Sequence, residues 1–224
     1  FDAPLGRVDR LDEGVVGVVG VQTDWTHSSR IGTRERPYAL RPATTELSRT
    51  VINTLGETPI EPRDRRPLRR ANRECLVDCG DAPIDAASVE RTTQSIAAMT
   101  EAIRAQGAIP LALGGDHYNS FPACLGYSRG LAVRHPDRRF GYIQIDGHLD
   151  FADRLGAWGT HNHATNGRRN SELPNIERAN MVWIDVTGWF DGDELALIEG
   201  MGGKIYSSGD VHSLGAQEVA RRAV

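Results

Sequence analysis

Short, uninterrupted apolar runs constrain the fold of this chain more strongly than any other feature. Four of them have the length of a strand: "GVVGVVGVQ" (14–22), "AIPLALG" (108–114), "FGYIQI" (140–145) and "MVWIDV" (181–186). Helical patterns lie between them, most clearly over residues 85–107, where apolar side chains recur at helical spacing. Apolar strands that alternate with helices are typical of a parallel sheet buried on both faces. We therefore predict an α/β fold, a three-layer open parallel sheet with helices on both faces.

The composition indicates a single globular domain over residues 1–224, with 39% hydrophobic and 25% charged residues. The formal net charge of −4 argues against nucleic acid as a partner, and no apolar run is long enough to span a membrane. "FDAPLGRVDR" at the start has no signal-peptide core, and three cysteines do not form a disulfide framework. These features predict a cytoplasmic protein. "EPRDRRPLRR" (61–70) is predicted as a solvated loop.

Side chains that can bind metals follow two of the predicted strands. His117 stands in "LALGGDH", and Asp146, His148 and Asp150 stand in "IQIDGHLDFAD". In open α/β sheets, ligands bind beyond the carboxyl ends of the strands. Residues two apart in an extended chain point the same way, so Asp146 and His148 can converge. Because such groups are costly to bury unless something binds them, the pattern favours a metal site.

The types of donor indicate which metals would suit this site. Imidazole and carboxylate without thiolate argue against structural zinc. Several carboxylates favour Mn²⁺, with Fe, Co and Zn as alternatives. Two metals that share a carboxylate lower the pKa of a bridging water, so that hydroxide is available near neutral pH. Taken singly, "GGDH" is also ordinary turn chemistry and "DGHLD" could be a polar loop with a capping aspartate, so the prediction depends on both motifs together.

These motifs resemble those of the ureohydrolases, the family of arginase and agmatinase. "GGDH" (114–117) followed by "DGHLD" (146–150) is similar to the family's metal motifs, and "HNHATNGRR" (161–169) resembles its His-(Gly/Ala)-Thr loop. "GTRERPYALR" (32–41) resembles the family's Gly-Thr-Arg segment, and "LVDCGD" (76–81) resembles one of its strands. The resemblance extends from about Gly14 to the end of the chain. Arg36 and Gly147 depart from the family pattern, and neither departure removes a ligand.

The resemblance implies a binuclear Mn²⁺ site and an amidinohydrolase reaction. His117 and Asp150 would hold one manganese, His148 would hold the other, and Asp146 would bridge the two. The bridging hydroxide would attack the carbon of an agmatine-like guanidino substrate and release urea, while His163 would relay a proton to the leaving amine. The residues after His117, "YNSFP", look more like those of agmatinases than of arginases. The family also implies a homo-oligomer, a trimer or hexamer.

One family motif is missing, and this leaves alternatives open. A second aspartate pair should follow a helix like "GAQEVARRAV" (215–224), where the sequence stops. We therefore expect the first two-thirds of a ureohydrolase, with the C-terminal part of the family fold absent and metal binding weak. The alternative is a non-catalytic ureohydrolase-like subunit of an oligomeric complex. A metal-dependent deacetylase of similar fold is a third possibility, against which "HNHATNGRR" and "GTRERPYALR" argue.

Overall fold

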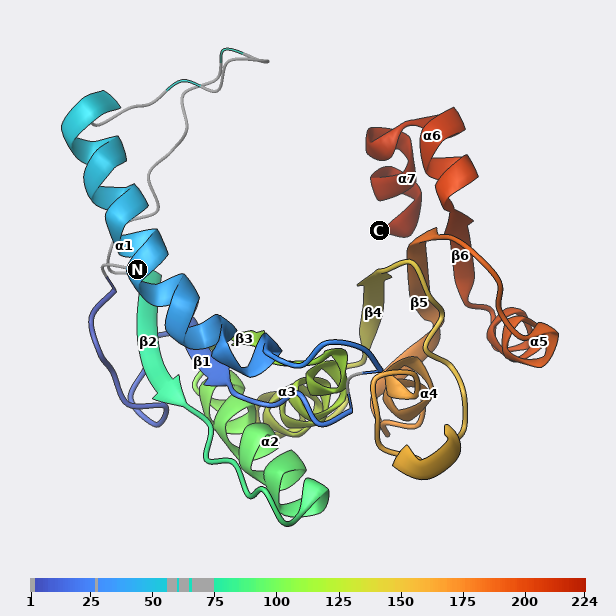
Figure 1. Cartoon of the computed structure of the whole chain (residues 1–224), viewed down its shortest axis with the longest axis horizontal. Helices are drawn as coiled ribbons and strands as arrows, with labels where there is room; N and C mark the ends of the chain where they lie inside the picture. The colour runs from blue at the N-terminus through green and yellow to red at the C-terminus, as the bar shows by residue number, and fades with distance from the viewer. Residues whose placement is uncertain (1–2, 27, 56–59, 61–64, 66–74) are drawn as a thin grey trace.

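The computed structural model describes residues 3–26, 28–55, 60, 65 and 75–224 (Figure 1). Its strands are β1 (Val16–Val21), β2 (Leu76–Asp81), β3 (Ile109–Gly114), β4 (Phe140–Ile145), β5 (Ile176–Val186) and β6 (Lys204–Ser207). Its α-helices are α1 (Arg36–Leu55), α2 (Val89–Ala105), α3 (Ser120–Arg134), α4 (Asn166–Ser171), α5 (Gly192–Gly200), α6 (Ser208–Leu214) and α7 (Ala216–Ala223). Each predicted strand is found within a few residues of its expected position.

All paired strands run parallel, as the apolar runs predicted. β1 lies between β2 and β3, and β5 lies between β4 and β6. Helices connect the strands in alternation, which confirms the predicted α/β fold class (Figure 1). Within the described residues, the strands form two three-stranded sheets and not a single sheet. β3 and β4 are each paired on one side only, so both are edge strands in this part of the chain.

Helices cover both faces of the first sheet, and two glycines of β1 permit their close approach. A Cβ added to Gly17 would lie 3.0 Å from Ile103 of α2, whereas a Cβ on Gly20 would lie 2.9 Å from Pro37 of α1. Residues three apart in a strand face opposite sides of the sheet. α2 and α1 therefore pack on opposite faces of β1, and an aliphatic core fills the side of α2.

Aromatic side chains form the core of the second sheet. The ring of Trp183 on β5 is fully buried and meets the rings of Phe151 and Tyr142 edge-on, with centroids 5.7 and 6.3 Å away. Its indole N–H donates to the backbone carbonyl of Leu149 at 2.8 Å. Leu149 and Phe151 flank Asp150, one of the predicted metal ligands, and both are buried. This core therefore anchors the segment that carries the site.

One side of β4 is left uncovered by the described residues. Tyr142 and Gln144 are buried, whereas the alternate side chains of Ile143 and Ile145 are 46% and 76% exposed. Exposed aliphatic residues also occur on β3, at Ile109 and Leu111. We predicted helices on both faces of the sheet; in the described part of the chain, this cover is complete at β1 and incomplete at β4.

Several element boundaries differ from the prediction. α1 runs through Pro42, although a proline inside a helix usually kinks or breaks it: here the proline removes one backbone donor without ending the helix. β5 begins at Ile176, before the apolar run that predicted it. α6 and the short α4 were not predicted. α6 begins at a capping box in which Ser207 and Asp210 exchange hydrogen bonds, a signal of only two residues.

Three other expectations concern cysteines, the charged loop and membranes. Cys75, Cys79 and Cys124 are free thiols, as predicted. The loop predicted at 61–70 lies outside the described residues except for Arg65. None of the helices in the described ranges combines the length and the apolar character that a membrane crossing requires.

Candidate metal centre

The two polar segments meet beyond the carboxyl ends of β3 and β4, although these strands belong to different sheets. A short 3-10 helix begins at His117 after β3, and Asp146 directly follows β4. His117 Nδ1 lies 2.7 Å from Asp150 Oδ2 and 3.5 Å from Asp146 Oδ2. One ligand atom from each of these residues lies within 4.8 Å of the other two. The structure thus brings three of the four predicted metal ligands into one group, called here the ligand group.

His148, the fourth predicted ligand, lies at the rim of the ligand group. Its Nδ1 is 3.3 Å from Asp146 Oδ1, and its backbone N–H donates to the same oxygen at 2.8 Å. The His148 side chain is 77% exposed, and it is not among the three clustered donors. Asp146 therefore faces His117 with one carboxylate oxygen and His148 with the other. A carboxylate that bridges two metal ions needs this arrangement. That His148 is a metal ligand stays a prediction.

Asp150 is the most firmly held member of the ligand group. Its φ of 48° lies in the left-handed region, which Asp tolerates better than most residues with a side chain. Only 8% of Asp150 is exposed. The Gln144 amide donates to Asp150 Oδ2 at 3.1 Å and to the backbone carbonyl of His148 at 3.2 Å, and the Tyr142 hydroxyl donates to Gln144 Oε1 at 2.9 Å. This chain of hydrogen bonds fixes the direction of the carboxylate.

The electrostatics of the ligand group favour a positive charge at its centre. Burial alone would lower the pKa of His117, but the hydrogen bond to Asp150 and the charges of Asp150, Asp146 and Asp116 outweigh it and raise that pKa. A proton on His117 partly compensates the neighbouring carboxylates. A divalent cation would compensate them more fully and would need the imidazole deprotonated.

The donor chemistry of the ligand group fits a divalent cation. One imidazole and two carboxylates suit Mn²⁺, Fe²⁺, Co²⁺ or Zn²⁺. A cavity of about 170 Å³ opens over the group and is lined by Ser28, Asp116, His117, Asp146, His148, Asp150 and His163. The clustered donors are enough to hold one ion, and a second ion would need His148 and further donors.

His163, the predicted proton relay, lines the same cavity. Its backbone N–H donates to Thr26 Oγ1 at 3.2 Å, and its ring packs edge-on against Trp158 at 5.7 Å. His163 Nδ1 is buried, and no hydrogen-bond partner for it occurs in the described part of the chain. A buried polar atom without a partner costs about 1–3 kcal/mol. The position suits a proton relay, and that role stays a prediction.

Two supporting residues were not recognised from the sequence. Asp116 is buried and accepts the backbone N–H and the hydroxyl of Thr26, both at 2.9 Å, which ties the loop after β1 to the loop after β3. Asn166 is buried, and its amide donates to the backbone carbonyls of His117 at 2.7 Å and His163 at 2.9 Å. Asp116 stands within "GGDH", so a motif pointed to it, whereas no local pattern distinguishes Asn166.

The segment that resembles the family's Gly-Thr-Arg motif forms structural ion pairs. Arg34 Nε donates to Asp24 Oδ1 at 2.7 Å, and the Asp24 side chain is fully buried. The hydrogen bond from Arg34 lowers the pKa of Asp24. Arg41 of α1 pairs with Asp78 and Asp81 of β2, at 2.7 Å in both cases. These contacts hold α1 and the loop after β1 against the first sheet.

A parallel α/β fold with a histidine and two carboxylates that converge beyond its strand ends is an arrangement that could hold a divalent metal ion. Comparison with known families makes the class of protein specific. The model of the arginase family matches residues 15–224. The chain belongs to the arginase family, as the motifs implied.

Curated relatives include hydrolases of several guanidino compounds. Guanidinopropionase from Pseudomonas aeruginosa is 27% identical over 213 residues, which cover 93% of this chain and 61% of that protein. Agmatinase from Bacillus anthracis is 28% identical over 143 residues, or 64% of this chain and 43% of that protein. These relatives are amidino hydrolases that act on C–N bonds. The chain therefore spans less than two thirds of the length of either relative.

Solved structures share the fold over nearly the whole chain. Proclavaminate amidino hydrolase from Streptomyces clavuligerus superposes with a TM-score of 0.72 at 20% identity, covering 99% of this chain and 66% of that one. Formiminoglutamase from Trypanosoma cruzi, solved with Mn²⁺, gives a TM-score of 0.70 at 21% identity, covering 93% and 65%. At these identities the likeness concerns the fold alone, and it confirms the arginase-like α/β class.

Proposed function

We propose that this protein is a metal-dependent amidinohydrolase that converts a small guanidino compound into urea and an amine. The observation that carries the proposal is the ligand group of His117, Asp146 and Asp150 beneath a cavity, in a chain of the arginase family. The names of the relatives agmatinase and guanidinopropionase point to guanidino substrates. The formiminoglutamase structure with Mn²⁺ supports manganese as the metal.

Each site residue has a distinct part in this proposal. His117 and Asp150 would hold one Mn²⁺, His148 would hold the second, and Asp146 would share its charge between them through its two oxygens. When bound, the metal pair supplies Lewis acidity and lowers the pKa of water. His163 lines the cavity with an unpartnered Nδ1, so it would carry a proton to the leaving amine.

We also propose that residues outside positions 1–224 complete the site. Four side chains supply few of the ligands that two divalent cations need, because each cation prefers four to six ligands, of which water provides only some. β4 carries the exposed side chains of Ile143 and Ile145 and ends directly before Asp146. An apolar segment could pack on these side chains, beside the metal site. From the family resemblance, we also predict that the protein forms a trimer or hexamer and works in the cytoplasm.

A urea-release screen with Mn²⁺ over a panel of guanidines tests the proposal. The protein expressed from the complete reading frame should release urea, and a chelator should abolish the activity. Titration of the 224-residue chain with Mn²⁺ should show at most one tight site and little turnover. Two tight sites and full turnover in that chain would refute the need for further ligands. A complete protein that binds Mn²⁺ but hydrolyses no guanidine would favour the non-catalytic subunit.

A further inference from the structure

Hydrogen bonds hold the backbone of His163 on both sides, but they do not hold its ring. The His163 N–H donates to Thr26 Oγ1 at 3.2 Å, and the His163 carbonyl accepts the Asn166 amide at 2.9 Å. Thr26 and Asn166 are both buried. In the ring, Nδ1 is buried and has no hydrogen-bond partner in the described part of the chain. The direction of the ring therefore depends on what packs against it.

The indole of Trp158 packs against this ring. The two ring centroids lie 5.7 Å apart and the ring planes meet at 80°, an edge-on arrangement that aromatic pairs favour. Trp158 is 42% exposed. It is not among the described residues that line the cavity over the ligand group, whereas His163 is. Trp158 therefore reaches the metal site only through His163.

Trp158 stands in a tight turn, from Leu155 to Gly159, that is closed by its own hydrogen bonds. The Leu155 N–H donates to the Gly159 carbonyl at 2.9 Å, and the Trp158 N–H donates to the Leu155 carbonyl at 3.0 Å. Gly159 has a φ of 70°, a left-handed value that lets the chain turn sharply after Trp158. The Gly159 carbonyl also accepts the Asn162 amide at 2.8 Å, which ties the turn to the following loop. The indole thus has a firm support.

The direction of the His163 ring decides which of its nitrogens can serve the cavity. Nδ1 is buried, so Nε2 is the nitrogen available to a molecule in the cavity. A group that transfers a proton must lie within hydrogen-bond reach of its partner. The torsion that turns a histidine ring has broad, roughly two-fold preferences, so it does not hold one direction by itself. Packing against Trp158 supplies that restraint.

We propose that Trp158 is a positioning residue, which holds the His163 ring with Nε2 toward the metal site. It acts only through His163. This inference rests on the proposed amidinohydrolase function and deepens the part that His163 has in it. The restraint on the ring exists without metal or substrate, so it can be measured apart from turnover.

Urea release by the complete protein with Mn²⁺ measures the effect on catalysis, with the guanidine that is hydrolysed fastest as substrate. Trp158→Ala should lower kcat about threefold to tenfold, the size of one aromatic contact, and leave KM and Mn²⁺ content within about twofold. Trp158→Phe keeps an aromatic ring at this place and should retain at least about half of the wild-type kcat. An equal loss in both variants would show that the ring contact is not what matters.

A double-mutant cycle distinguishes positioning from a general effect on the fold. If Trp158 acts through His163, Trp158→Ala should have no further effect on kcat in a protein that already carries His163→Ala. A loss of the same size in both backgrounds would overturn the inference.

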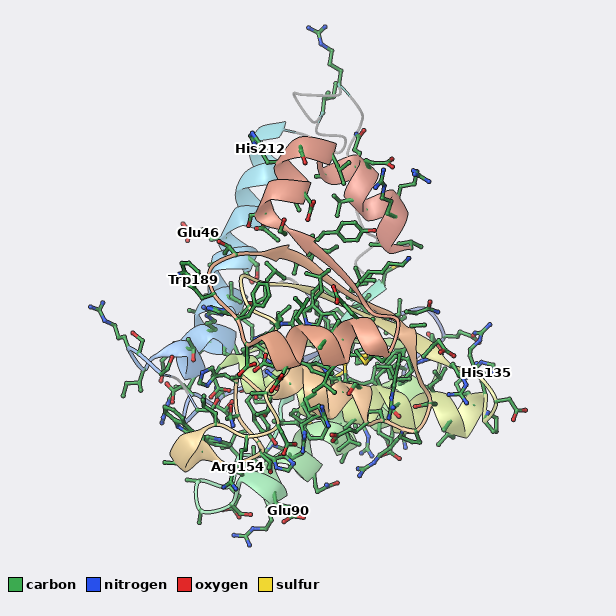
Figure 2. All side chains as sticks on the ribbon, turned by 90° about the vertical axis from the view of Figure 1, so that its right-hand side faces the viewer. Glu46, Glu90, His135, Arg154, Trp189 and His212 are labelled. Atoms are coloured by element: carbon green, nitrogen blue, oxygen red, sulfur yellow. The ribbon has the colours of Figure 1, made fainter. Side chains whose placement is uncertain are left out.

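Chemical modification of His163 tests the restraint without metal or turnover. Diethyl pyrocarbonate acylates unprotonated imidazole nitrogens, and tandem mass spectrometry resolves His163 from the nearby His161. In EDTA, Trp158→Ala should speed the modification of His163 severalfold, because an unrestrained ring exposes both nitrogens, whereas Trp158→Phe should change it little. The exposed His135 and His212, which Figure 2 labels at separate edges of the molecule, should react at the same rate in every variant.

The outcomes separate this inference from the proposed function. Chemical denaturation first shows that each variant is folded, as expected for a change in a surface turn. Unchanged modification of His163 in Trp158→Ala would overturn the inference, whether or not urea is released. If no guanidine is hydrolysed, the proposed function fails, and the modification rates still decide whether Trp158 holds the ring.

Discussion

Replacing Asp150 by Asn isolates the contribution of one carboxylate charge to metal binding. The variant should fold, because Asn also tolerates the left-handed φ of 48° found at this position. The Asn carbonyl can still accept the hydrogen bond that Gln144 donates at 3.1 Å. The charge next to His117 disappears, however, and with it the strongest reason for a cation to bind there. We therefore expect a folded protein with weak affinity for Mn²⁺.

The size of the effect can be estimated from linkage between binding and folding. A residue that only orients a metal ligand typically contributes tenfold to a hundredfold in affinity, so loss of a direct donor should cost at least about a hundredfold. With Mn²⁺ at about 100 times the wild-type Kd, binding adds about 2.7 kcal/mol to the free energy of unfolding. For a variant whose Kd is a hundredfold weaker, the same concentration adds only about 0.4 kcal/mol.

Chemical denaturation of the complete protein in EDTA and in Mn²⁺ measures both gains. Asp153→Asn is the matched control, since it makes the same substitution at a side chain that is 68% exposed and paired with Arg169 at 2.6 Å. The control should keep the full stabilisation by Mn²⁺. If Asp150→Asn gains as much from Mn²⁺ as the wild type does, Asp150 is not a metal ligand and the ligand group has been misassigned.

Three further predictions follow from the site and the fold. Asp146→Asn should lose both metal and urea release, whereas His163→Ala should keep its metal and slow turnover by about 10²–10⁴-fold; loss of metal in His163→Ala would make the histidine a ligand. Arg34→Met should lower the unfolding free energy at pH 7, because the buried Asp24 carboxylate loses the hydrogen bonds from the Arg34 side chain and keeps the one that the Gly32 backbone N–H donates at 2.8 Å in the loop after β1. Arg34 lowers the pKa of Asp24, so the pair stabilises the fold above the ordinary Asp pKa of about 3.9 and ceases to do so as the pH falls through the lowered value. The difference in unfolding free energy between the wild type and Arg34→Met should therefore be smaller at pH 3 than at pH 7. An equal difference at both pH values would contradict the pairing. Ile145→Ser should make the 224-residue chain more soluble but lower the unfolding free energy of the complete protein by about 1–3 kcal/mol; an unchanged complete protein would show that nothing covers this residue.

The strands and the long helix α2 could be predicted because each has a local signature. A buried parallel strand is an apolar run whatever its neighbours are, and β1, β3, β4 and β5 lie where the four apolar runs occur. The sequence also indicated that His117 and Asp150 stand after strands. Their contact at 2.7 Å depends on how two separate sheets are placed, which no local pattern contains. The direction of the His148 ring was equally inaccessible, because packing does not fix a side chain that is 77% exposed.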